Sequence, residues 1–320
     1  MWRVSLSWLR NPGAFNKTPT CGNRLLKCSI YGQGGIFLFR IGVNMDGVLI
    51  VNKPISKSSF DMIRDVRKKY NTKKVGHIGT LDPMATGVLP VLVGKATKLC
   101  DYLMEHDKEY VATLQLGMQT STGDSEGDVI SNIPVSENIF DNNIIDNVLN
   151  SFLGEYFQIP PMYSAIKVNG KKLYELARSG QTIERTPRKV HIYEIEKLDI
   201  LKNQNQISFR VVCSKGTYIR TLCEDIASKL DTCGYMSSLV RTRVGNFKIE
   251  NADTFIELKD VLTDVPRIDV FDIGKLKNGI KLPAPHDLNS YIGLGNLYYN
   301  NSFLGICKIE KGFYKRFIIL

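Results

Sequence analysis

The sequence is most informative at residues 76–87, which read GHIGTLDPMATG. One carboxylate, Asp82, lies here between glycines and a proline. Glycine lets a ligand approach the backbone closely, and Pro83 restricts the turn. Loops of this kind often carry function, although an isolated loop Asp is more often a turn or capping residue. The stretch by itself therefore makes Asp82 a candidate site residue and nothing more.

The segments around this loop mix strands and helices. A strand is predicted at 47–52, and Ser58-Ser59 then predicts the start of a helix. The apolar face of that helix is expected to carry Phe60, Ile63, Val66 and Tyr70. Further strands are predicted at 88–93, 109–116, 188–200 and 207–213, and helices at 96–104 and at 219–230 ahead of Gly234. Because there is no strict βαβ repeat, the pattern favours an α+β fold with a mixed or antiparallel sheet flanked by helices.

The last fifty or so residues have a different pattern. Short strand candidates at 297–299, 304–306 and 317–319 are separated by Gly and Asn, as in a small all-β module. We therefore expect a domain boundary near residue 265. The larger domain would span 45–265 and the smaller β-rich domain 266–320.

Residues 1–44 do not resemble the start of this fold. They hold six of the ten net positive charges and no Asp or Glu. Two interpretations compete for such a segment. It is either upstream sequence translated from a start codon placed too early, with Met45 as the true start, or a transit peptide. We favour the first interpretation.

The remaining chain is only mildly basic, and its positive charge is concentrated at 64–74. Six basic side chains meet one acid there, an arrangement that suits phosphates but also a solvated helix face. The seven cysteines form no C-x-x-C pair and only four histidines accompany them, so we expect no metal site, no disulfide framework and a reducing compartment. Apolar runs are too short for a membrane span.

The string GHIGTLDPMATGVLP at 76–90 closely resembles the catalytic motif of the TruB family of tRNA pseudouridine synthases. The resemblance covers roughly residues 45–250, in order, through NKP (52–54), KEY (108–110), TGD (122–124), PPMYSA (160–165) and SKGTYIR (214–220). It implies the pseudouridine synthase fold. A looser match at 277–279, 298–299 and 303–305 resembles the PUA-like RNA-binding module found at the end of many family members.

What the resemblance implies is a cofactor-free isomerisation of uridine to pseudouridine. The bond from ribose C1′ to uracil N1 breaks, the base rotates, and C5 bonds to C1′. Asp82 matches the family's essential aspartate. An ionised carboxylate can stabilise or trap the electron-poor sugar, and attack on the base or a glycal route are open alternatives.

Further residues match family positions around the target nucleotide. Arg220 matches the arginine that pairs with the aspartate and keeps it ionised. Tyr110 matches the side chain that stacks on the flipped base, although its alternation alone would assign it to the core. His77 matches the residue beside the flipped nucleotide, and Tyr218 and Leu239 match further positions around the base.

Other charged residues are expected to contact RNA or to shape the loops near the site. The side chains expected to meet RNA backbone are Lys53, Arg64 and Lys68. Asp124 is expected either to hold a loop near the site or to make a turn. Arg241 and Arg243 lie two apart and on a strand would share one face, either RNA-facing or solvated.

The family resemblance also implies a substrate and a setting. We expect uridine 55 in the T-loop of tRNA as substrate, acted on by a stand-alone, monomeric bacterial enzyme in the cytoplasm, without an obligatory protein partner. An organelle is the alternative if residues 1–44 are a transit peptide. Two other functions compete: a non-catalytic RNA-binding or RNA-folding protein, and a hydrolase that uses Asp82, for which no paired carboxylates or metal-ligand spacing are evident.

Overall fold

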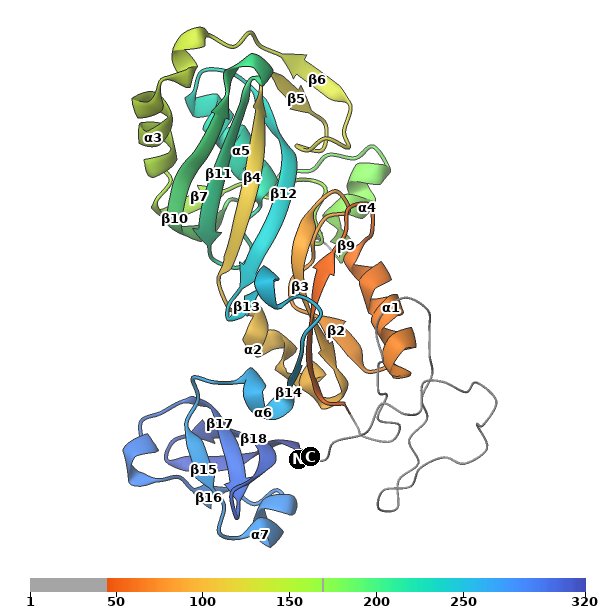
Figure 1. Cartoon of the computed structure of the whole chain (residues 1–320), viewed down its shortest axis with the longest axis vertical. Coiled ribbons are helices and arrows are strands. Elements are labelled where there is room, and N and C mark those ends of the chain that lie inside the picture. The colour runs from red at the N-terminus through yellow and green to blue at the C-terminus, as the bar shows by residue number, and fades with distance from the viewer. Residues whose placement is uncertain (1–44, 169) are drawn as a thin grey trace, which may run out of the picture. The chain divides into compact units, whose positions relative to one another are not determined.

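The main sheet dominates the computed structural model, which describes residues 45–168 and 170–320 (Figure 1). The predictions for residues 1–44 lie outside the described residues. In sheet order the strands are β14 (Phe255–Glu257), β1 (Gly47–Lys53), β3 (Thr86–Val93), β12 (Gly234–Val244), β4 (Lys108–Leu116), β11 (Gln206–Cys213), β10 (Arg188–Leu201) and β7 (Gly154–Gln158). Two short strands, β2 (Val75–His77) and β13 (Phe247–Lys248), pair with β3 and β12.

One strand pair in this sheet is parallel. β12 runs parallel to β3, with Val240 opposite Thr86 and Arg241 opposite Gly87, and antiparallel to β4. The other neighbours in the sheet are antiparallel. This mixed, largely antiparallel sheet confirms the predicted α+β fold class. The parallel pair also brings the end of the Asp82 loop beside the middle of β12.

The helices are mostly short. They are α1 (Ser59–Tyr70), η2 (Gly94–Leu99), α2 (Cys100–Met104), η3 (Glu137–Phe140), α3 (Asn142–Asn150), α4 (Leu173–Arg178), η4 (Lys202–Gln204), α5 (Ile219–Lys229), η5 (Ile249–Asn251), α6 (Leu258–Val261), α7 (Ile273–Lys277) and η6 (His286–Leu288). Two small hairpins pair β5 (Met118–Thr120) with β6 (Val129–Asn132) and β8 (Lys167–Val168) with β9 (Lys171–Lys172). Within the described residues, no helix has the length and apolarity needed to cross a membrane.

The strands β1 and β3 are buried on both faces. Leu49 and Leu89 pack with residues of α1 in one apolar cluster. Their neighbours Val48 and Val88 belong to a second cluster on the opposite face. Successive side chains of a strand point to opposite faces, so a nearly continuous apolar run fills both layers.

Helix α1 begins where the sequence predicts, with one correction to its buried face. Ser58 is the N-cap, and its side chain accepts a hydrogen bond from the backbone N–H of Asp61 while Asp61 caps in return. Ile63 and Val66 are buried as expected. Phe60 is 61% exposed instead, because the buried stripe runs through positions 59, 62, 63 and 66. This aromatic ring is therefore available at the surface.

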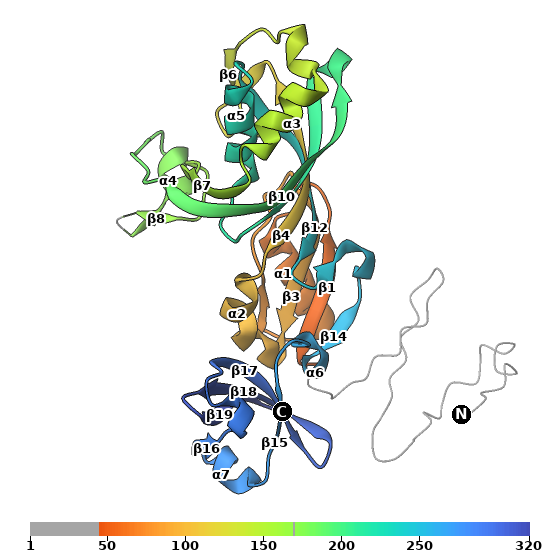
Figure 2. The same cartoon turned by 90° about the vertical axis from the view of Figure 1, so that its left-hand side faces the viewer.

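Helices α3 and α5 contact each other, and α5 packs against β12 and β4 while α3 packs against β10 (Figure 2). The largest apolar cluster joins their buried faces to these strands. Gly234, which the sequence pattern places as a stop after α5, opens β12 instead. A Cβ at Gly234 would lie 2.7 Å from Leu114 and 2.8 Å from Ala227, so this glycine permits the close approach of α5 to the sheet.

A second sheet occupies the C-terminal part of the chain. Its order is β15 (Arg267–Asp269), β17 (Gly293–Tyr299), β18 (Ser302–Glu310), β19 (Phe313–Ile319) and β16 (Leu282–Pro283). It has an apolar cluster of its own around Leu297 and Ile309. Ile306 and Ile318, however, belong to the same cluster as Val48 and Val88 of the main sheet. The β-rich character of this segment agrees with the predicted fold class.

Candidate active site

A cavity of about 830 Å³ lies beside the loop that carries Asp82. Ligand-binding cavities in proteins are commonly of this size. Seven of the ten site residues predicted from the sequence line it: His77, Asp82, Tyr110, Asp124, Tyr218, Arg220 and Leu239. They come from β2, the following loop, β4, the turn after β5, the start of α5 and β12. The fold thus gathers residues that are far apart in the sequence around one hollow.

The Asp82 loop joins β2 to β3. Each backbone carbonyl from residue 79 to residue 83 accepts a hydrogen bond. Arg241 donates to the carbonyls of residues 79 and 80, and the Ser59 hydroxyl donates to that of residue 81. The carbonyl of Asp82 accepts from the N–H of Ala85, and that of Pro83 accepts from Lys53. Such complete pairing fixes the backbone and leaves the Asp82 side chain, 37% exposed, at the cavity.

Arg220 is the cation that faces Asp82. Its Nε lies 3.1 Å from Oδ2 of Asp82, and its side chain is only 5% exposed. Nη1 donates to the carbonyl of Thr122 at 3.0 Å, and Nη2 donates to the carbonyl of Tyr163 at 2.8 Å. The two carbonyls fix the plane of the guanidinium, so Asp82 meets a cation held in one orientation.

A second carboxylate, Asp124, lies near the same nitrogen of this guanidinium. Its Oδ2 is 3.7 Å from Nε of Arg220, and its Oδ1 accepts hydrogen bonds from the Thr122 hydroxyl and the N–H of Glu126. Asp124 therefore both makes the turn and holds the loop near the site, the two readings that the sequence left open. Burial, together with the charges of Asp124 and Asp82, raises the pKa of Glu126, which also lines the cavity.

Tyr110 and Leu239 share one face of the sheet at the cavity. Tyr110 is opposite Arg241 in the pairing of β4 with β12, and Leu239 is opposite Ala112. Tyr110 belongs to the apolar core, as its alternation predicts, and also lines the cavity. Burial raises the pKa of its hydroxyl, and the neighbouring Arg241 guanidinium opposes that shift.

His77 and Tyr218 complete the group around the cavity. Burial, with a smaller contribution from Arg241, lowers the pKa of His77. Its Nδ1 is buried and finds no hydrogen-bond partner within 45–168 and 170–320. Tyr218 is the N-cap residue of α5, and the amide of Gln158 pairs with both its N–H and its carbonyl. The backbone at the start of α5 is thereby anchored to β7.

Three predicted RNA contacts lie outside the cavity lining. Lys53 is fully buried, and its ammonium donates to the carbonyls of Pro54, Lys57 and Pro83. The prediction that Lys53 meets RNA backbone is therefore corrected. Its buried ammonium stabilises the loop by donating to three carbonyls. Arg64 and Lys68 are exposed on α1, as a backbone contact requires.

The two arginines of β12 do not share a face. Arg241 is buried, so neither the RNA-facing nor the solvated reading holds for it. Arg243 is partly exposed and donates to Asp107 at 2.7 Å. A register shift between the two positions breaks the two-residue alternation, which is why they separate.

Several cavity residues were not singled out by the sequence pattern. Thr122 and Tyr163 fall inside the family motifs and could have been found there. Phe60, Glu126 and Tyr174 carry no such signal and reach the cavity only through the fold.

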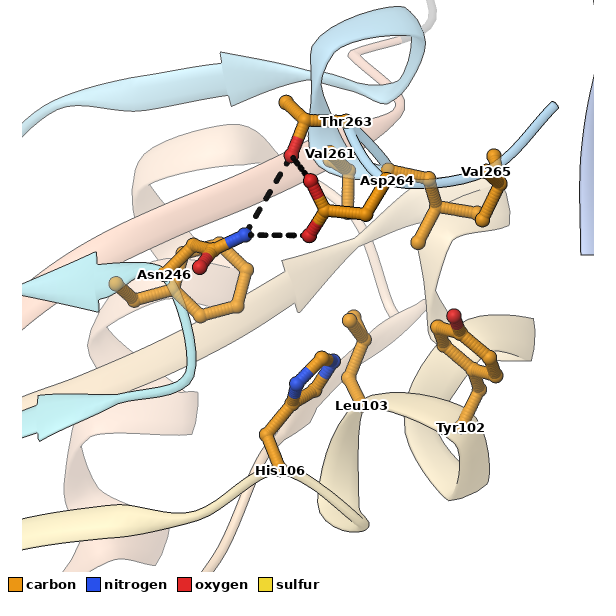
Figure 3. Close-up of a pocket in the computed structure, with 10 residues that line it drawn as sticks. Tyr102, Leu103, His106, Asn246, Val261, Thr263, Asp264 and Val265 are labelled. Carbon is orange, nitrogen blue, oxygen red and sulfur yellow. Dashed lines mark hydrogen bonds between the residues drawn. The ribbon is translucent and has the colours of Figure 1, made fainter. Parts of the chain in front are cut away.

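Two further features bear on the chemistry. No group of three or more His, Cys, Asp or Glu in the described part of the chain is arranged to hold a metal ion. A second hollow, shown in Figure 3, lies between His106, Asn246 and Thr263. It holds only about 20 Å³, which is room for about one water molecule, so it is too small for a nucleotide.

The chain is similar to known proteins over most of its length. Residues 67–219 match the model of the TruB family pseudouridylate synthase N-terminal domain, and residues 220–269 match that of the tRNA pseudouridylate synthase B C-terminal domain. The tRNA pseudouridine synthase B of Clostridium tetani is 43% identical over 286 residues, which cover 84% of this chain and 98% of the relative. That of Clostridium kluyveri is 44% identical over 279 residues, covering 82% and 95%.

A solved structure has a similar fold. A chain in the crystal structure of a Cbf5-Nop10-Gar1 complex superposes with a TM-score of 0.60 at 25% identity, covering 82% of this chain and 78% of that one. The family models, the relatives and the shared fold agree. The chain therefore belongs to the TruB family of pseudouridylate synthases.

Proposed function

We propose that this protein isomerises uridine to pseudouridine in tRNA, with uridine 55 of the T-loop as the target, and that Asp82 is its essential carboxylate. The observation that carries the proposal is the geometry of Asp82. Its carboxylate meets the cavity with the buried Arg220 guanidinium 3.1 Å away. Relatives more than 40% identical over most of the chain are named tRNA pseudouridine synthase B.

The reaction needs a carboxylate and a place for a rotating base. The bond from C1′ to N1 breaks, C5 bonds to C1′, the C5 proton leaves and N1 gains a proton, so atoms and charges balance without an oxidant or a second substrate. The ionised Asp82 is suited to stabilise or trap the electron-poor centre when the base leaves. Arg220 sets a fixed positive charge beside it and limits where it can point. Fixed charges of this kind need no rearrangement during reaction.

The remaining cavity residues suit a flipped nucleotide. Tyr110 offers an aromatic face, Leu239 an apolar surface on the same side of the sheet, and Tyr218 a second ring. His77 also lines the cavity, and its buried Nδ1 has no hydrogen-bond partner in the described chain. The exposed Arg64 and Lys68 of α1 would contact phosphates outside the cavity.

The domain assignment belongs to the same proposal. We propose residues 45–265 as the catalytic domain and 266–320 as an RNA-binding module, which is supported by the separate sheet and the separate apolar cluster of the second segment. A cytoplasmic, bacterial setting is proposed on the strength of the bacterial relatives.

A direct assay tests the function. Purified protein is incubated with a transcribed tRNA T-arm without added metal or cofactor, and pseudouridine is mapped by carbodiimide modification and reverse transcription. We expect one new stop at the T-loop uridine. A T-arm that stays unmodified over hours at saturating protein would refute the proposal.

A further inference from the structure

Arg241 places a buried cation beside the Asp82 loop without an anion in the described chain to pair with it. Its side chain is 1% exposed, and it forms no ion pair within the described residues. Burying a cation costs several kcal/mol unless hydrogen bonds or an anion compensate it. A side chain such as Met would fill the space without that cost. The contacts of the guanidinium should therefore show what it does.

All three nitrogens of the Arg241 guanidinium donate to backbone carbonyls around the Asp82 loop. Nη2 lies 3.1 Å from the carbonyl oxygen of Gly79, and Nη1 lies 3.5 Å from that of Thr80. Nε lies 2.8 Å from the carbonyl oxygen of Val88, on β3 beyond the loop. One planar group thus joins the start of the loop to the strand that follows it.

Glycines at both ends of the loop make room for this contact. A Cβ at Gly79 would lie 3.2 Å from Nη1 of Arg241. A Cβ at Gly87 would lie 2.2 Å from the backbone carbonyl oxygen of Arg241, closer than atoms can approach. Both glycines also have positive φ, 75° and 102°. The loop is therefore shaped to sit directly on this arginine.

The same guanidinium lies beside Tyr110. Arg241 and Tyr110 are opposite each other in the register of β12 and β4, so their side chains leave the sheet on the same face. The loop carrying Asp82 and the strand carrying Tyr110 are not neighbours in the sheet, because β3 and β4 are separated by β12. Arg241, on β12, donates to the carbonyls of the loop and lies beside Tyr110.

We propose that Arg241 is a positioning residue that fixes the Asp82 loop relative to Tyr110, so that carboxylate and aromatic ring meet the substrate in one geometry. The proposal deepens the function proposed above and rests on it. Arg241 acts through the backbone of the loop and does not itself touch the reacting atoms. A displacement of about 1 Å at a reacting centre can cost roughly a hundredfold in rate.

The test compares R241K with R243K in the full chain. Lysine keeps the charge at position 241 but lacks the planar fork that reaches three carbonyls. Arg243 is two residues along and pairs with Asp107 away from the cavity, so it is the matched control. The measurements are the single-turnover rate at saturating T-arm, T-arm affinity by filter binding, melting temperature, and amide hydrogen exchange of residues 78–88 without RNA.

We expect R241K to lose at least about tenfold in single-turnover rate. Its T-arm affinity should stay within about twofold, and exchange in 78–88 should become faster. R243K should match the wild type in all four measurements. A wild-type rate and wild-type exchange in R241K would overturn the proposal, as would a rate loss that merely follows weaker RNA binding or unfolding. If the wild type converts no uridine, the proposed function fails, whereas the exchange measured without RNA still decides the role of Arg241.

Discussion

The Nε of Arg220 lies 3.1 Å from Oδ2 of Asp82, and the two side chains differ sharply in exposure, 5% against 37%. The buried partner is the cation, held by two backbone carbonyls, and the exposed partner is the anion at the cavity. The exposed part of the Asp82 side chain can therefore exchange solvent for RNA when the substrate binds, while the buried Arg220 stays in place. This asymmetry suits a carboxylate that acts on a substrate against a fixed background charge.

Asp82→Asn should abolish isomerisation while leaving RNA binding largely intact. The amide has nearly the same shape, so the loop should keep its structure, but it cannot stabilise or trap an electron-poor sugar. We expect the single-turnover rate to fall by at least about a thousandfold, the scale of a lost nucleophile or major electrostatic group. Carbodiimide mapping gives the rate and filter binding the affinity. Residual turnover within tenfold of the wild type would exclude the assigned role.

Asp124→Asn should slow the reaction less severely. Asp124 shares Arg220 with Asp82, and its loss removes one charge-assisted contact worth about 1–3 kcal/mol. We therefore expect a rate lower by about ten- to a hundredfold with unchanged T-arm affinity. Asp107→Asn is the matched control, because Asp107 pairs with Arg243 outside the cavity lining. Equal effects of the two substitutions would mean that the Asp124 contact has no special role.

The sequence pattern predicts most of the fold, for a physical reason. The burial of a strand can be read from its sequence when apolar residues form a continuous run, as in β1, or alternate with polar ones, as in β4. The edge strands β7 and β14 are not among the predicted strands, and neither is β12, which lies in the middle of the sheet. Its pattern is broken by register shifts after Met236 and after Arg241, and it carries a buried arginine, so it does not read as a central strand.

The site is predictable in part only. The local sequence marks Asp82 as a candidate, but Arg220 and Tyr110 are brought to it by strands and helices that no local rule connects, and only the family motifs point to them. For Lys53 and Arg241 the positive charge predicts an exposed side chain, because charged residues are usually exposed, but both are buried. The carbonyl acceptors of Arg241 and one of the three acceptors of Lys53 lie in other segments of the chain, so burial becomes visible only in the folded structure.

Lys108→Met should change the pH dependence of stability. Burial, with the nearby Arg241 charge, lowers the pKa of Lys108 to about 8 from its ordinary value of 10.5. Between these values the unfolded chain binds a proton that the folded chain does not, so this lysine makes stability rise with pH from about 8 to 10.5. We expect the variant to lose that rise. Urea unfolding midpoints at pH 7.5 and 9.5 measure the difference.

The control for this prediction is Lys215→Met, which removes an exposed lysine paired with Glu105. Effects common to all other titrating groups cancel when each variant is compared with the wild type at the same pH. A rise in midpoint between the two pH values that is the same in Lys108→Met and the wild type would show that Lys108 has no depressed pKa in the folded protein.

Ile306→Ala should destabilise the main sheet as well as the C-terminal one. Ile306 is fully buried in β18, yet it packs in the cluster that contains Val48 of β1 and Val88 of β3. Removing a buried isoleucine side chain to Ala typically costs about 2–5 kcal/mol. Hydrogen exchange of β1 and β18 peptides in rising urea should therefore shift together. Ile309→Ala, in the cluster confined to the C-terminal segment, is the control and should shift β18 more than β1. If Ile306→Ala shifts β18 alone, the two sheets unfold independently and their shared cluster contributes nothing to stability.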